Sequence, residues 1–113
     1  MVTHSREQAI FHAVAEPTRR RLLDKLSRGP RSAGHLARKF RCSRPAVAKH
    51  LRILRRAGLV RARRLGRHQI YSLTPAPLAS VERWIGQYRA FWSTRLDELT
   101  DYFEQSSGEG SPA

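Results

Sequence analysis

The stretch from Ser43 to Gly58, with the sequence SRPAVAKHLRILRRAG, limits the fold of this chain more than any other segment. It has an apolar stripe at i, i+4 and i+7, formed by Val47, Leu51 and Leu54. This spacing predicts an amphipathic helix with one face against a core. Ser43 suits the N-cap, Pro45 is tolerated in the first turn, and Gly58 suits the position just after the helix.

The other face of this expected helix is cationic. Its basic residues are Arg44, Lys49, Arg52, Arg55 and Arg56. A short helix that packs on one side and is polycationic on the other suits the DNA major groove. A second short helix is expected from Ser32 to Phe40, and only Arg41 and Cys42 separate the two helices. A helix, a tight turn and a helix form the helix-turn-helix arrangement.

Charge is unevenly distributed along the chain. Residues 1–74 contain 19 Arg or Lys and 3 Asp or Glu, whereas residues 75–113 contain 3 Arg and 6 acidic residues. Charge alone fits a solvated surface as well as a polyanionic partner, but together with the helix pair it favours double-stranded DNA. We expect no membrane association, because the basic residues are spread over short elements and no segment approaches a transmembrane length.

The hydrophobic period changes after Leu59. Apolar and polar residues alternate up to Leu65, where Leu65-Gly66 marks a turn, and alternate again up to Leu73. This pattern predicts a two-stranded hairpin, which after a recognition helix makes a winged helix. The expected tip is cationic and consists of Arg63, Arg64, Arg67 and His68.

Two helices, over about 5–15 and 17–28, are expected before the helix pair, and a long one, about 78–105, after the hairpin. The last helix has apolar residues at alternating steps of three and four and holds six of the nine aromatic residues. A monomer would leave this face in water, so we expect a homodimer to bury it. An alternative, in which these rings line a small-molecule pocket, stays open. Residues 106–113 have the composition of a disordered tail.

The successive segments AEPTRRRLLDKL, SAGHLARKFRCSRPAVAKHLRILRRAGLV and GRHQIYSL resemble the ArsR/SmtB family of bacterial winged-helix repressors. The resemblance covers about residues 8–105. It implies one mainly α domain over 1–105, with about five helices and a two-stranded wing. It also implies a homodimer that binds a palindromic operator and represses its own operon.

The resemblance further implies where DNA and the second subunit are contacted. DNA contacts fall at the start of the second helix of the pair and on the wing, at Arg44, Pro45, Ala48, Lys49, Arg52, Arg64 and Arg67; we add His68 from the wing tip. The family dimerises through its first and last helices. The apolar residues expected at this interface are Ile10, Val14, Val81, Trp84, Ile85, Tyr88, Trp92 and Leu99.

One departure from the family concerns metals. Well-known members sense metals through a Cys-x-Cys pair on the third helix or through His and acidic ligands on the last helix. Here the segment from Ala33 to Ala37 has no thiol, and the last helix has no His. Cys42, the only cysteine, is expected to be a core thiol. We therefore expect no metal site and no cofactor, as in the subgroup without metal-sensing sites. A small-molecule or protein effector stays open.

The sequence indicates no enzyme, because its scattered glycines form no phosphate loop and no catalytic set is evident. Residues 1–15 lack a continuous apolar run, so we expect no signal peptide, and we expect a cytoplasmic, nucleoid-associated bacterial protein. The main expectation is a sequence-specific dimeric repressor. The alternative is a non-specific architectural nucleic-acid-binding protein, which a specificity ratio at fixed salt would distinguish.

Overall fold

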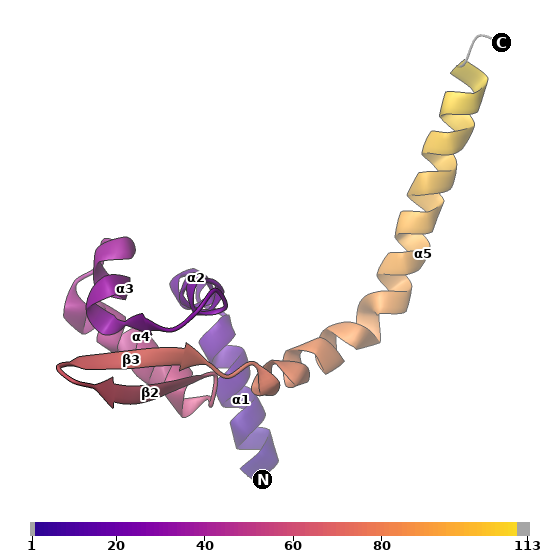
Figure 1. Cartoon of the computed structure of the whole chain (residues 1–113). Coiled ribbons are helices and arrows are strands. Elements are labelled where there is room, and N and C mark those ends of the chain that lie inside the picture. Colours follow the sequence, from indigo (N-terminus) through magenta and orange to yellow (C-terminus); the bar gives the residue numbers. More distant parts are fainter. Residues whose placement is uncertain (1, 111–113) are drawn as a thin grey trace. The chain divides into compact units, whose positions relative to one another are not determined.

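The structure, a computed structural model, describes residues 2–110. Its elements, in chain order (Figure 1), are α1 (Val2–Val14), α2 (Pro17–Leu26), β1 (Arg31–Ser32), α3 (Ala33–Lys39), α4 (Arg44–Arg56), β2 (Val60–Leu65), β3 (His68–Leu73), the 3-10 helix η1 (Ala76–Leu78) and α5 (Ala79–Gly110). The chain divides into two compact units, residues 1–81 and 82–113. The first unit has the predicted winged helix-turn-helix fold, and the described part of the second, residues 82–110, is the remainder of α5.

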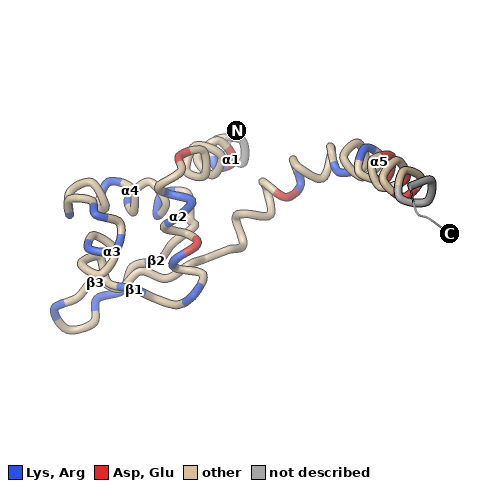
Figure 2. The backbone as a smooth tube through the Cα atoms, turned by 90° about the horizontal axis from the view of Figure 1, so that it is seen from above, with Lys and Arg blue, Asp and Glu red and all other residues tan. Residues whose placement is uncertain are grey.

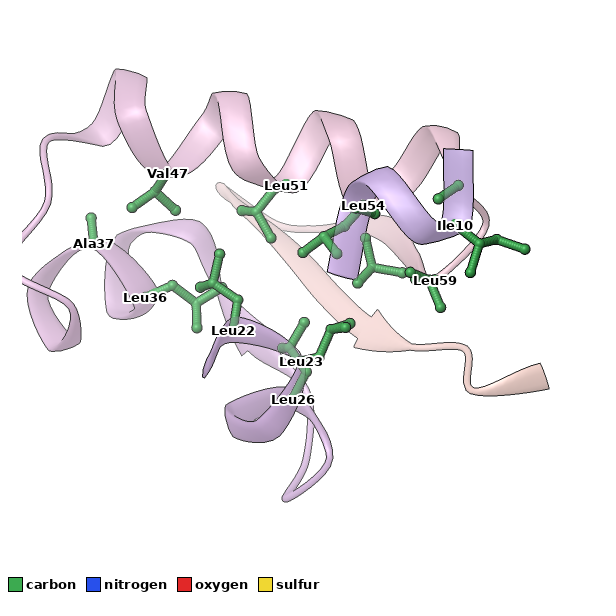
Figure 3. Packing of buried hydrophobic residues seen from close by; sticks show 13 residues of the cluster. Ile10, Leu22, Leu23, Leu26, Leu36, Ala37, Val47, Leu51, Leu54 and Leu59 are labelled. Carbon is green, nitrogen blue, oxygen red and sulfur yellow. The ribbon is translucent and has the colours of Figure 1, made fainter. Parts of the chain in front are cut away.

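The core of the first unit lies between its helices and the start of β2. In Figure 3, Val47, Leu51 and Leu54 of α4 point toward the leucines of α2 and α3. All three are buried, which confirms the predicted apolar stripe. Burying one such side chain contributes roughly 1.5–3 kcal/mol. The core therefore holds α4 by one face and leaves the opposite face free.

A single guanidinium group connects three helices of this unit. Arg19 of α2 is buried, and its Nε and Nη2 donate to the carbonyl oxygens of Ala13 (2.8 Å) and His12 (3.0 Å). Its Nη1 lies 3.3 Å from Nδ1 of His50 on α4. The carbonyls at a helix C-terminus have no partners within the helix and attract positive charge. Arg19 therefore closes the end of α1 and links it to α2 and α4.

The predicted ends of α4 are confirmed. Ser43 is the N-cap, and its Oγ accepts a hydrogen bond from the backbone N–H of Ala46 at 3.2 Å. At the other end, Gly58 has a φ of 77° and donates its N–H to the carbonyl of Arg55 at 3.0 Å. Glycine adopts this left-handed conformation without a steric penalty, so the helix stops there.

The wing belongs to a three-stranded antiparallel sheet of order β1-β3-β2, whereas the sequence predicted two strands. The predicted hairpin is present, with Leu65 opposite His68 and Gly66 at a φ of 62° in the two-residue loop. The additional strand pairs Arg31 with Tyr71 and Ser32 with Ile70. A two-residue strand has no measurable period, so the sequence pattern does not reveal it. Its consequence is that the start of α3 is fixed to the wing.

Several helix boundaries differ from those expected. Among the described residues α1 begins at Val2 instead of Ser5, and α2 ends at Leu26 instead of Arg28. The last helix continues to Gly110, so residues 106–110, which were expected in a disordered tail, are helical. Extending a formed helix costs far less than nucleating one, which allows Ser and Gly to prolong it. Residues 111–113 lie outside the described part of the chain.

Candidate nucleic-acid interface

The basic face of α4 is exposed, as predicted. The residues expected to contact DNA on this helix are all exposed: Arg44, Pro45, Ala48, Lys49 and Arg52. Figure 2 shows that Lys and Arg recur along α3, α4 and the β2–β3 hairpin. The first two turns of α4 therefore present both cations and small side chains to solvent.

The predicted wing residues Arg64, Arg67 and His68 are exposed as well. Nε of Arg64 donates to the carbonyl of Gly66 at 3.4 Å, which holds this side chain against the hairpin loop. Because side chains alternate along a strand, Arg61 and Arg63 lie on one face of the sheet and Arg64 on the other.

A cleft of about 250 Å³ lies where the start of α3, the start of α4 and the wing meet. Its lining residues are Ser32, Ala33, Gly34, Arg38, Arg44, Arg67, His68 and Gln69. The cleft brings together three predicted residues, Arg44, Arg67 and His68. It adds Arg38, which the sequence interpretation missed. Its spacing of four residues from Gly34 places both on one face of α3, but this spacing alone does not indicate a site.

The arginines of this cleft have no neutralising partner. Among residues 5–106, whose side chains are described, the guanidinium groups of Arg38, Arg44 and Arg67 form neither a hydrogen bond nor an ion pair. By contrast, Arg28, just after α2, pairs with the exposed Asp24 of that helix at 3.6 Å. The cleft thus concentrates positive charge that the described protein does not compensate, which suits an anionic ligand.

Other basic clefts lie elsewhere on the first unit. One of about 420 Å³ is lined by Arg21, Asp24, Lys25, Arg28, Lys39, Phe40 and Arg41. Burial lowers the pKa of Lys25, and the neighbouring cations Lys39, Arg31 and Arg28 lower it further. The outer face of the sheet carries another, of about 600 Å³, lined by Pro30, Arg61, Ala62, Arg63, Leu65, Ile70 and Ser72.

His35 of α3 lies near these cations. Its Nε2 is buried without a hydrogen-bond partner in the described structure. Burial lowers the pKa of His35, and the charges of Lys25, Arg31, Arg38 and Lys39 lower it further. The ring is therefore neutral near pH 7, because an additional positive charge is disfavoured there.

The residues predicted at the dimer interface fall into two groups. Ile10 is buried in the core of the first unit, and the partly buried Val14 and Val81 pack against it. The others lie on α5 beyond Val81: Ile85 is half-buried, and Trp84, Tyr88, Trp92 and Leu99 are exposed. The apolar surface available for a partner therefore lies mainly on α5.

Among residues 5–106, whose side chains the structure describes, no group of three or more His, Cys, Asp or Glu is arranged to hold a metal ion. Cys42 is half-buried against the core, and its Sγ donates to the carbonyl of Phe40 at 3.3 Å. In the same part of the chain, no helix combines the length and apolar character that crossing a bilayer requires.

Comparisons with known proteins agree with this geometry. The profile of a helix-turn-helix domain matches residues 14–63, from the end of α1 into β2. The HTH-type transcriptional regulator Rv2034 of Mycobacterium tuberculosis is 36% identical over 110 residues, covering 97% of this chain and 97% of that protein. The transcriptional repressor SdpR of Bacillus subtilis is 37% identical over 76 residues, covering 67% of this chain and 84% of that protein.

Solved structures give the same result. An ArsR-like transcriptional regulator from Rhodococcus sp. RHA1 matches with a TM-score of 0.67 and 32% identity, covering 90% of this chain and 96% of that chain. These relatives are regulators of transcription, which agrees with the expectation that the chain is not an enzyme. The chain belongs to the ArsR/SmtB family of winged helix-turn-helix, DNA-binding transcriptional regulators.

Proposed function

We propose that the protein is a homodimeric repressor that binds a palindromic operator at its own operon and does not respond to metals. The observation that carries this proposal is the continuous exposed basic surface formed by the start of α4 and the wing. A recognition helix capped at both ends presents its groove-facing side chains in one geometry, which favours sequence-specific binding over architectural binding. Such a protein acts at the bacterial nucleoid, in the cytoplasm.

The dimer part of the proposal rests on α5. Trp84 and Trp92 are each 49% exposed, and Tyr88 and Leu99 are exposed on the same helix. Exposed apolar patches of this kind are unusual on soluble monomers and normally mark an interface. In a two-fold dimer the same patch is buried on both subunits, and two recognition helices meet half-sites about 34 Å apart.

The metal part of the proposal rests on ligand chemistry. Regulatory metal sites need several thiolate, imidazole or carboxylate ligands converging on one point. Cys42 is instead half-buried, with its thiol donating to a backbone carbonyl. Zinc, cadmium and arsenite are therefore expected to leave the protein–operator complex intact.

Selection of bound sequences from a random duplex pool tests the specificity. We expect a palindrome to be enriched, and its affinity at fixed salt to exceed that of a scrambled duplex by a factor of at least about 10³. Sedimentation equilibrium of the same preparation should give a dimer. Equal affinity for the selected and scrambled duplexes would instead identify an architectural protein, and a monomer at tens of micromolar would refute the dimer.

A further inference from the structure

We propose that the cleft between α3, α4 and the wing binds a single phosphate group of the DNA backbone, held by Arg38, Arg44 and Arg67. We call it the phosphate cleft. The inference rests on the proposed DNA-binding function and specifies which residues bind the DNA backbone and which read bases. Arg44, which the family resemblance places among the general DNA contacts, is a backbone ligand here and does not read a base.

The orientation of Arg44 is the first observation. A Cβ added to Gly34 would lie 3.2 Å from Nη2 and 3.8 Å from Cζ of Arg44, and 3.7 Å from Nη1 of Arg38. Arg44 therefore folds back over α3 from the first residue of α4. Two guanidinium groups from two helices converge at one glycine, where the missing side chain leaves them room.

The wing supplies the third cation. The β1–β3 pairing, with Ser32 opposite Ile70, brings β3 against the start of α3. Arg67, in the loop just before β3, consequently lines the same cleft as Arg38 and Arg44. The three arginines thus come from separate parts of the chain, and the tertiary fold brings them together.

The charge of the cleft is the second observation. A guanidinium group stays protonated at any physiological pH, so its repulsion with a neighbour is not relieved by losing a proton. The acidic residues described in the first unit do not line the cleft. Glu16 caps α2, Asp24 pairs with Arg28, and Glu7 lies on α1. The remaining way to compensate the charge is a bound anion.

The position of the cleft selects the anion. A phosphate accepts several hydrogen bonds and matches the planar fork of arginine. When the start of a recognition helix enters the major groove, the surface between that helix and the wing faces the flanking strand. Base reading is then left to the exposed residues beyond Arg44, namely Pro45, Ala48 and Lys49.

Single alanine variants test the assignment. Arg38→Ala, Arg44→Ala and Arg67→Ala are compared with Arg61→Ala, a matched control because Arg61 is exposed on the other face of the sheet. Fluorescence anisotropy with a selected and a scrambled duplex gives affinities over a range of salt. Each cleft variant should weaken both duplexes equally, by about 10- to 100-fold, the range for losing a charge-assisted hydrogen bond. Because the three arginines share one phosphate, removal of any one of them should reduce the salt slope by at most about one.

A neutral methylphosphonate placed at each backbone position of the selected duplex locates the phosphate. One position per half-site should reproduce the loss, and there Arg38→Ala and Arg44→Ala should cause no further loss. If Arg44→Ala weakens only the selected duplex, it reads a base and the proposal is wrong. A scan in which no position couples to the variants also refutes it.

Inorganic phosphate distinguishes a backbone ligand from a free anion. Added at constant ionic strength, it should displace DNA no better than chloride does. Saturable competition that Arg38→Ala abolishes would make the cleft a free-phosphate site and overturn the backbone assignment. The repressor proposal is tested separately. It fails if the random pool yields no preferred sequence. In that case the phosphate cleft would still be supported if the three variants weakened binding to scrambled DNA equally.

Discussion

Replacement of Arg19 by alanine should destabilise the protein far more than replacement of its neighbour Arg20. Arg19 is 6% exposed and donates to the carbonyls of His12 and Ala13. Arg20 donates to the carbonyls of Val14 and Ala15, at 2.9 and 3.0 Å, but is exposed. The two arginines therefore make the same kind of contact with the same helix end, but only Arg19 is buried and also lies against His50.

The expected loss of unfolding free energy follows from the backbone carbonyls that each substitution leaves without a donor. Arg19→Ala removes two hydrogen bonds from a charged donor, each contributing roughly 1.5–3 kcal/mol, and leaves a gap beside the core. We expect the free energy of unfolding to fall by about 3–5 kcal/mol. At the position of Arg20, water replaces the lost donor, so Arg20→Ala should cost less than about 1 kcal/mol.

Urea unfolding followed by far-UV circular dichroism measures both variants. Fluorescence is a poor probe of this core, because Trp84 and Trp92 are the two tryptophans and both lie on α5. All samples need one protein concentration, because the stability of a dimer depends on it. Equal losses for Arg19→Ala and Arg20→Ala would refute the reasoning that burial decides the contribution of these contacts.

Three further predictions follow from single residues. Arg41 has a φ of 53°, a conformation that costs an L-residue roughly 1–2 kcal/mol, so Arg41→Gly should stabilise the protein by up to about 1 kcal/mol in urea unfolding; a loss of stability would contradict this. Burial and nearby cations lower the pKa of His35 in the folded state below 6.5, its value in the unfolded chain. The neutral imidazole therefore contributes fully to the free energy of unfolding above pH 6.5, and this contribution is lost as the pH falls below that value. Thermal unfolding of His35→Gln should therefore change less between pH 7 and pH 5 than that of the wild type, and parallel curves would exclude this role. Trp92→Ala should weaken the dimer by about 3–5 kcal/mol if the ring is fully buried there, and operator affinity should fall in parallel; sedimentation equilibrium and anisotropy measure both, and a monomeric variant with full affinity would refute the coupling.

The sequence predicts α4 well because its signals are local. The spacing of Val47, Leu51 and Leu54, with Ser43 and Gly58 at the ends, depends only on residues within the helix. The same reasoning reveals the hairpin, since alternation and the turn glycine are also local. These elements carry most of the predicted DNA-contacting residues, which is why their exposure agrees with expectation.

The phosphate cleft was not predictable in the same way. It depends on β1, whose two residues pair with β3 across a long stretch of chain and leave no periodic trace. It also depends on Gly34, whose missing side chain matters only once Arg44 from another helix lies over it. Both are tertiary facts, so Arg38 could be recognised as an exposed basic residue but not as part of a site.

Helical periodicity distinguishes Arg19 from the two arginines that follow it in α2. The run Arg19, Arg20 and Arg21 has uniform chemistry, but only Arg19 lies on the stripe with the buried leucines, at positions 19, 22, 23 and 26. A charged residue at such a position must have its hydrogen bonds satisfied internally. Two adjacent arginines with the same composition thus have different roles, because one faces the core and the other faces water.

Structural and ligand-binding arginines of this chain differ in whether their guanidinium groups have hydrogen-bond or ion-pair partners within the protein. A structural arginine such as Arg19 has its donors satisfied by carbonyls of the same unit. Arg38, Arg44 and Arg67 converge on one cleft without a hydrogen bond or ion pair among the residues described. Convergent and uncompensated charge costs free energy in the unbound protein, and the cost is recovered when an anion binds. The unbound cleft is therefore already arranged to receive a phosphate of the DNA backbone.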